Sequence, residues 1–299
     1  MTLRRPGVLA VVAGLTLVAA AAMAQYRGEV EVQAVVAPVT VYTTSGRVVS
    51  DVPQSRFSLY VDGLRVPIRD FHREADLPLS LGFVLDTSGS MAGRKMHACQ
   101  RLVGAFLAER RPEDQLALWT FGDDRVLERF PFGMGWYLLP RVLETLKPWS
   151  TTALYDMVLR VPDVMERADH PRRAAIMLTD GADNASRLSA DEARAIAERL
   201  QTPIYVLGVE PPPRPALQTG PSYEAVLSMI AESSGGRYRR IPRLEDMPGV
   251  ARTLLDELSS RFIVTFATSG VGERRWRSLE IRVEGYRAVT RKGYHGTLP

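Results

Sequence analysis

The sequence has very little cysteine and histidine. Cys99 is the one cysteine among its 299 residues, so no disulfide can form within the chain and stability must come from a hydrophobic core. The histidines are far apart and show no zinc-ligand spacing; they are His72, His97, His170 and His295. A disulfide-stapled scaffold and a zinc-binding one are therefore both excluded.

Signatures of several enzyme classes are also missing. The chain has no Walker-type phosphate loop and no Gly-x-Ser-x-Gly elbow, and no histidine is placed to act as a base for a serine nucleophile. Phosphoryl transfer through Asp86 would call for a second acid two residues later, where Ser88 stands. We therefore expect that the protein is not an enzyme.

Basic residues exceed acidic residues by only a small number. The formal net charge is +4, and it becomes +2 when Arg4 and Arg5 are removed (4 − 2 = 2). That bias is too small to argue for a nucleic acid or an anionic membrane as partner. The basic aromatic stretch 274–277 precedes an apolar and polar alternation typical of a half-exposed strand. We expect no nucleic-acid partner.

The N-terminus has the pattern of a secretory signal. Arg4 and Arg5 precede an apolar run over 8–22, and Ala22-Met23-Ala24 offers a small-residue cleavage site. The pattern predicts a signal peptide over 1–24 and export to the periplasm or the medium, with no stable membrane insertion after cleavage. An uncleaved anchor is the alternative, although the run is near the short limit for a membrane span.

The rest of the chain divides into three stretches. Residues 25–75 alternate as short strands do. Over 76–261, apolar runs alternate with helical patterns, which predicts an α/β fold with a doubly wound, mainly parallel sheet flanked by helices. The runs are 79–85, 116–121, 174–178 and 204–209, and the helical patterns are 95–109, 138–146, 153–168, 190–200 and 247–260. Residues 262–299 return to strand patterning, and we expect them to join 25–75 in one small β-subdomain built from both chain ends.

Polar residues follow the first buried strand directly. Asp86, Ser88 and Ser90 lie on a tight loop with Gly89, at the carboxyl end of a central strand, where open α/β sheets bind ligands. An oxygen-only set with little charge suits a hard cation such as Mg2+ or Mn2+. The alternative is that these groups only cap the following helix.

Two further segments add oxygen-bearing residues to those of the Asp86 loop. Thr152 stands just before a predicted helix, and Asp180-Gly181 ends another apolar strand. An Asp-x-Ser-x-Ser loop, a Thr ahead of a helix and a strand-terminal Asp-Gly, in this order, resemble the metal-ion-dependent adhesion site of von Willebrand factor A (VWFA) domains. The resemblance covers about residues 79–260.

The resemblance implies a role for each residue of this site. Ser88 and Ser90 would bind the ion through their hydroxyls, and Thr152 directly or through water. Asp86 and Asp180 would act mainly through water and hydrogen bonds, which leaves the ion undercharged. An Asp or Glu of a protein partner would then complete the coordination.

Further residues near these segments are also candidates for the site. The Thr motif is often preceded by Gly-Gly, but Ser150 and Thr151 stand here, so Thr151 competes with Thr152 as a ligand. Asp183 is expected behind the ligands or in solvent. The aromatic stretch 130–137 and the proline-rich loop 211–221 are either ordinary packing or a partner-binding rim; the rim residues would be Phe132, Trp136, Tyr137 and Arg214.

The flanking stretches carry a further resemblance. Segments 44–49, 57–63 and 291–294 resemble exported VWFA-related proteins typical of Acidobacteria. The leading hypothesis is an exported adhesion-type module that grips a partner carboxylate through its ion. The alternative is a structural scaffold in which the ion only makes the loop face rigid.

Overall fold

The computed structural model describes residues 34–74, 77–123, 125–149, 151–181, 183–212, 221–267 and 276–295. The predicted signal peptide over 1–24 lies outside these residues, as do Ser150 and Arg214. The described residues all fall in one compact unit that begins at Ala34. Within the described part of the chain, no helix is long and apolar enough to cross a membrane.

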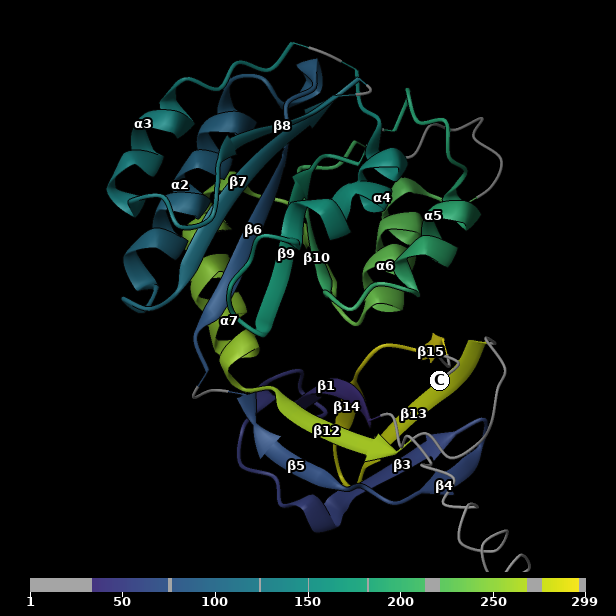
Figure 1. The fold of residues 1–299 in the computed structure, drawn as a ribbon. Coiled ribbons are helices and arrows are strands. Elements are labelled where there is room, and N and C mark those ends of the chain that lie inside the picture. The colour runs from purple at the N-terminus through teal and green to yellow at the C-terminus, as the bar shows by residue number, and fades with distance from the viewer. Residues whose placement is uncertain are drawn as a thin grey trace, which may run out of the picture. The chain divides into compact units, whose positions relative to one another are not determined.

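A six-stranded sheet forms the middle of the α/β part (Figure 1). Its order is β11-β10-β9-β6-β7-β8, and all neighbours pair in parallel except β7 and β8, which are antiparallel. Parallel neighbours require crossover connections, which the helices supply. The strands are β6 (Leu79–Asp86), β7 (Gln115–Gly122), β8 (Arg125–Phe130), β9 (Arg172–Thr179), β10 (Ile204–Val209) and β11 (Tyr238–Ile241).

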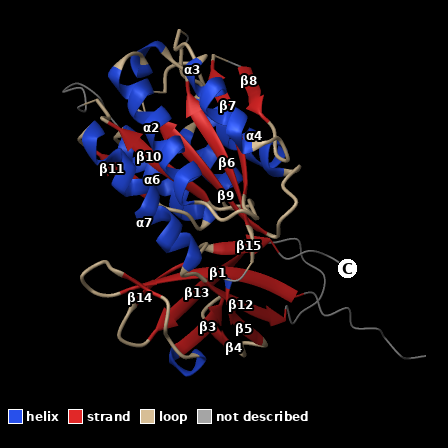
Figure 2. Ribbon diagram, turned by 90° about the vertical axis from the view of Figure 1, so that its left-hand side faces the viewer, coloured by secondary structure: helices blue, strands red, loops and turns tan. Residues whose placement is uncertain are grey.

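Helices cover both faces of this sheet (Figures 1 and 2). One face carries α2 (Arg94–Glu109), α3 (Leu139–Glu144) and α7 (Met247–Ser259). The other face carries α4 (Leu154–Met165), α5 (Ala190–Ala197) and α6 (Tyr223–Ser234). Short 3-10 turns are η1 (Gln54–Arg56), η3 (Gly89–Met91), η4 (Trp136–Leu138) and η5 (Leu244–Asp246).

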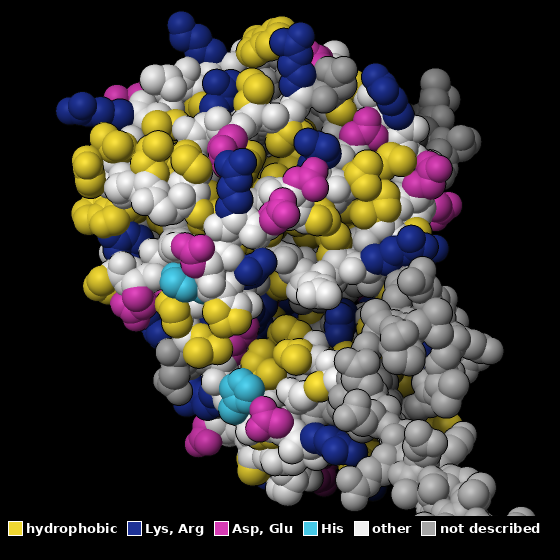
Figure 3. Space-filling model, in the orientation of Figure 1, with side chains coloured by type: hydrophobic (Ala, Val, Ile, Leu, Met, Phe, Trp, Pro, Cys, Tyr) yellow, Lys and Arg dark blue, Asp and Glu magenta, His cyan; other side chains and the backbone are white. Residues whose placement is uncertain are grey.

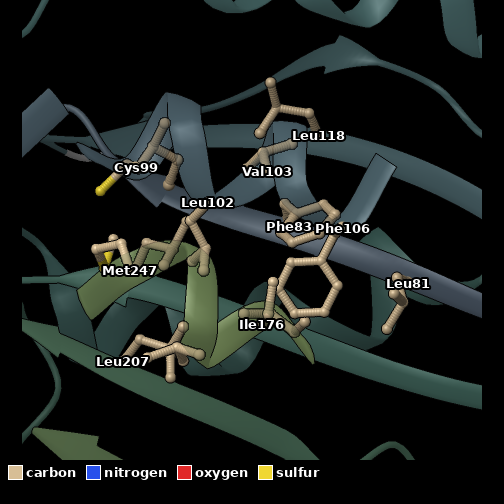
Figure 4. Packing of buried hydrophobic residues seen from close by; sticks show 14 of the residues in the cluster. Leu81, Phe83, Cys99, Leu102, Val103, Phe106, Leu118, Ile176, Leu207 and Met247 are labelled. Atoms are coloured by element: carbon tan, nitrogen blue, oxygen red, sulfur yellow. The ribbon is translucent and has the colours of Figure 1, made fainter. Parts of the chain in front are cut away.

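The two faces of the sheet bury separate apolar clusters. Successive side chains of a strand point to opposite faces, so Phe83 and Leu85 pack under α2 while Val84 packs under α4. On the first face, the rings of Phe83 and Phe106 meet edge to face with centroids 5.2 Å apart (Figure 4). Because both faces are covered, β6 is buried along its whole length, which explains its continuous apolar run.

The β part contains two antiparallel sheets. One has the order β14-β1-β12-β5, with β2 pairing β1 at its side, and the other has the order β15-β13-β3-β4. A third apolar cluster is drawn from these strands and from Val52, which lies between β2 and η1. The strands are β1 (Ala34–Tyr42), β2 (Val48–Val49), β3 (Phe57–Val61), β4 (Leu64–Val66), β5 (Asp70–Arg73), β12 (Phe262–Ala267), β13 (Trp276–Val283), β14 (Arg287–Val289) and β15 (Gly293–His295).

Strands from before and after the α/β part pair with each other. β1 pairs with β12 and β3 pairs with β13, so both chain ends build the β part. The expected mainly parallel, doubly wound arrangement holds only in part, because β8 runs antiparallel and the two other sheets make the whole mixed. The limits 25–75, 76–261 and 262–299 stay predictions.

Candidate metal site

The Asp86 carboxylate organises the loop that follows β6. It is fully buried; Oδ1 accepts the Ser88 backbone N–H at 2.8 Å, and Oδ2 accepts the Thr179 hydroxyl at 2.7 Å. Burial raises the pKa of Asp86 to about 6, and the charge of Asp180 acts in the same direction, while the two hydrogen bonds oppose them. Asp86 therefore joins the ends of β6 and β9 through hydrogen bonds.

Ser88 and Ser90 present two hydroxyls side by side. Their Oγ atoms are 3.1 Å apart; Ser88 is buried and Ser90 is exposed, so the pair leads from the interior to solvent. Two ligands of an octahedral Mg2+ with bonds of about 2.1 Å lie roughly 3 Å apart, so the spacing fits a shared ion. Neither η3, with Ser88 at its N-cap, nor α2, with Gly93 at its N-cap, has a side-chain capping bond, which favours the ion over the capping alternative.

Thr151 and Thr152 differ in the hydrogen bonding of their hydroxyls, which the sequence alone did not reveal. The Thr151 hydroxyl and N–H both donate to Asp123 Oδ1, at 2.5 and 2.9 Å. The Thr152 hydroxyl oxygen is buried and has no hydrogen-bond partner among the described residues. An unpartnered buried hydroxyl is the kind of atom that a ligand satisfies, which favours Thr152 as the ligand.

The loop before α4 is held by the segment after β9. Asn184 Oδ1 accepts the Thr152 N–H at 2.9 Å, and the N–H groups of Asn184 and Ala185 donate to the Thr152 carbonyl. Asp183 Oδ1 accepts the Leu154 N–H at 2.9 Å, at the start of α4. Asp183 therefore has a structural hydrogen bond at this helix end, and Asn184 fixes the backbone of Thr152.

Asp180 is buried and paired. Its Oδ2 lies 2.9 Å from the Lys95 ammonium, and its side chain is 1% exposed while that of Lys95 is 20% exposed. Across the described residues, no group of three or more His, Cys, Asp or Glu side chains could hold an ion. Any ion in these loops therefore depends on hydroxyls as well as carboxylates, and the oxygen donor set present fits Mg2+ or Mn2+.

Trp136 and Tyr137, two residues considered for a partner-binding rim, do not lie at these loops. Trp136 stacks on Arg110, with the guanidinium 4.2 Å from the ring centroid, and Arg110 follows the end of α2 opposite to Lys95. A helix of this length spans about 24 Å, so Trp136, and Tyr137 beside it, lie far from the loops. Phe132 packs on Trp119 in the core under α4.

Three residues near the loops were missed by the sequence analysis. The indole of Trp149 is 69% exposed, and its backbone N–H donates to the Thr87 carbonyl at 3.0 Å, within the Asp86 loop. Asn184 and Lys95 are the other two. No periodicity or spacing marks them, because their role arises only when separate loops meet. On the face seen in Figure 3, basic and acidic side chains are interspersed rather than gathered in one patch.

Comparison with known proteins supports one family. A model described as von Willebrand factor type A domain matches residues 81–182. Among curated proteins, no match was found. The solved structure of a von Willebrand factor type A protein from Catenulispora acidiphila is 11% identical, with a TM-score of 0.50 over 89% of this chain and 75% of that one.

Two other solved structures are similar over smaller shares of this chain. The pilus adhesin SpaC from Lactobacillus rhamnosus GG is 10% identical, with a TM-score of 0.49, over 74% of this chain and 44% of that one. An aerotolerance-related membrane protein from Bacteroides fragilis is 16% identical, with a TM-score of 0.46, over 60% of this chain and 98% of that one. The family match and the fold together support a von Willebrand factor type A domain in the α/β part of this chain.

Proposed function

We propose that this protein is an exported adhesion-type module that binds a protein partner through one Mg2+ or Mn2+ ion. The ion would be held by Asp86, Ser88, Ser90, Thr152 and Asp180. The Thr152 hydroxyl carries the proposal, because it is buried and, within the described part of the chain, unpartnered. Leaving such a group unsatisfied costs about 1–3 kcal/mol, and a bound ion would remove that cost.

The roles of these residues follow from their contacts. Ser88 and Ser90 offer adjacent hydroxyls, and Asp86 holds the Ser88 backbone in place. Asp86 and Asp180 already accept hydrogen bonds from Thr179 and Lys95, so they are placed to act behind the hydroxyls. A bound divalent cation supplies positive charge that a partner's Asp or Glu would neutralise at the exposed Ser90 side.

Trp149 supports a binding role for this face. It is a large exposed aromatic residue whose backbone is hydrogen-bonded to the Asp86 loop. Exposed Trp residues are frequent energetic anchors of protein interfaces. A carboxylate on the ion and an apolar group on Trp149 would together define the partner.

The structural scaffold is the second candidate. In that role the ion would be needed to hold the loops together. The loops already share hydrogen bonds, from Thr179 to Asp86, from Trp149 to Thr87 and from Thr152 to Asn184. These contacts need no ion, which favours binding over scaffolding.

Titration calorimetry with Mg2+ and Mn2+ tests the proposal. We expect saturable binding by the parent protein, loss of binding by Ser88→Ala, and similar melting temperatures for both in EDTA. Ser228→Ala is the matched control, because the Ser228 hydroxyl contacts Glu232 on the exposed side of α6. No binding by the parent would refute the ion site, and a large drop in melting temperature in EDTA would favour the scaffold.

The partner carboxylate needs a second measurement. Water-proton relaxation reports the number of waters on protein-bound Mn2+. We expect a short glutamate-containing peptide to lower that number in the parent, and a glutamine-containing peptide to leave it unchanged. Equal effects of the two peptides would argue against carboxylate recognition.

A further inference from the structure

The positively charged side chain of Lys95 lies at the candidate site. Lys95 is the second residue of α2, and its Nζ lies 2.9 Å from Asp180 Oδ2. Asp180 is fully buried at the end of β9, and the Asp86 carboxylate at the end of β6 is buried too. Two buried carboxylates would repel each other without a positive charge between or beside them.

We infer that the Lys95 ammonium is a built-in counter-ion that competes with the divalent cation for Asp180. The inference rests on the proposed function, because it concerns the ion of that same site. An ammonium within hydrogen-bond distance uses one carboxylate oxygen that the ion, or its water, needs. Its charge also repels a divalent cation at short range.

The surroundings of Lys95 allow its ammonium to move away from Asp180 when a metal ion binds. Its side chain is one-fifth exposed, and a four-carbon stem with free rotation can carry the ammonium into solvent. The neighbouring Arg94 shows that solvent is within reach, since its side chain is 79% exposed. By contrast, Asp86 has no exposed surface and accepts two hydrogen bonds, so the carboxylates stay while the lysine moves.

Binding of the ion is therefore an exchange. The ammonium leaves Asp180 and the divalent cation takes over the charge balance, so the lysine lowers the affinity for metal. When the ion is removed, the ammonium returns and keeps Asp180 paired. Lys95 thus stabilises the protein without metal and sets the metal concentration at which the site fills.

Lys95→Met tests the inference, because methionine keeps the apolar stem and removes the charge. We expect at least tenfold tighter Mg2+ binding by calorimetry, since the competitor is gone. We also expect a melting temperature several degrees lower in EDTA, because the buried Asp180 carboxylate loses the positive charge of Lys95. Saturating Mg2+ should narrow that gap between Lys95→Met and the parent.

Two control variants distinguish the effect of the Lys95–Asp180 contact from the effect of removing any positive charge near the site. Arg94→Met removes a positive charge at the adjacent residue, whose partner Glu245 is 3.7 Å away at the surface. It should leave both the affinity and the melting temperature near those of the parent. Lys95→Arg keeps the charge and should bind Mg2+ more weakly than Lys95→Met.

The outcomes distinguish this inference from the proposed function. Equal or weaker Mg2+ binding by Lys95→Met, with a parent that binds, overturns the competition and leaves the ion site standing. Saturable binding by neither protein overturns the ion site and the competition with it. Tighter binding by Arg94→Met and Lys95→Met alike also overturns the inference, because the effect would then be long-range charge.

Discussion

Two neighbouring threonines of the candidate site differ in what their hydroxyls contact. Thr151 donates to Asp123, whereas the Thr152 hydroxyl is buried without a partner in the described part of the chain. Valine has nearly the shape of threonine, so it removes the hydroxyl and little else. The pair therefore offers a matched comparison within two residues.

Thr152→Val should weaken Mg2+ binding at least tenfold. The melting temperature in EDTA should stay the same or rise, because the substitution removes a buried polar atom that makes no hydrogen bond. Calorimetry and thermal melting measure the two effects. Thr151→Val is the control and should keep its metal affinity; a greater loss with Thr151→Val would mean that Thr151 is the ligand.

Asp123 gives a pH-dependent readout of the same loop. The hydrogen bond from the Thr151 hydroxyl holds the pKa of the Asp123 carboxyl below its usual range. A pKa lowered in the folded state contributes stability that is present above the unfolded-state pKa and is lost as pH falls through the folded-state pKa. Thr151→Val should raise the pKa of Asp123 toward its ordinary value, as carboxyl-carbon NMR titration would measure. An unchanged pKa would show that this hydroxyl does not set it.

At the scale of elements, one buried ion pair joins the strands at which the chain enters and leaves the α/β part. Arg261, just before β12, donates to Glu74, just after β5, and both side chains are at most 5% exposed. The Glu74 N–H also donates to the Arg261 carbonyl at 2.9 Å. Side chains and backbone thus hold the same two points together.

Breaking this pair should destabilise the protein strongly. Glu74→Gln leaves the Arg261 guanidinium buried without a counter-charge, which costs about 3–5 kcal/mol of unfolding free energy. Urea unfolding measures the loss. The exposed pair Glu280–Arg282 serves as the control, and Glu280→Gln should change stability little because solvent screens that pair. Equal losses from the two substitutions would contradict this account.

The sequence predicted the central strands well, because burial on both faces makes them continuously apolar. The runs 79–85 and 204–209 match β6 and β10 to within one residue. The edge strands β8 and β11 were missed, since they are short, rich in arginine and only partly buried. Helix α6 was missed too, because Ser228 interrupts its apolar pattern and the helix ends in two serines.

The site was predictable only where it is a linear motif. Asp86, Ser88 and Ser90 stand on one loop, so their proximity follows from the sequence, and the structure shows the two hydroxyls adjacent. The choice between Thr151 and Thr152, and the contacts of Lys95 and Asn184, depend on loops that meet only after folding. The sequence left the stretch 130–137 open between packing and a partner-binding rim, because it does not show that β8 runs antiparallel and leads the chain away from the carboxyl ends of the strands.

At the scale of the whole molecule, the apolar core is divided. Two clusters lie on the faces of the six-stranded sheet, and the third belongs to the strands of the β part. A fragment of residues 77–261 keeps the first two clusters and all five proposed site residues. We expect it to fold, as circular dichroism would show, and to bind Mg2+ with an affinity within about threefold of the parent's, because no ligand comes from the β part.

A fragment of residues 77–299 is the contrasting case. It keeps β12 and β13 but lacks β1, β3 and β5, so β12 loses both of its neighbours and β13 loses one. Unpaired apolar edges promote aggregation, and this fragment should be less soluble than 77–261 in a sedimentation assay. Equal solubility of the two fragments would show that the late strands do not need the early ones.

The pairing of the first strand with the late ones also sets an order of events in time. Val39 meets Phe262, roughly 220 residues further along the chain, and such long-range contacts form slowly. The strands and helices of the α/β part follow one another closely and can assemble before the C-terminal residues are available. β1 lacks its neighbour β12 until those later residues have been made, so during synthesis that edge of β1 is open to a protease or to another chain.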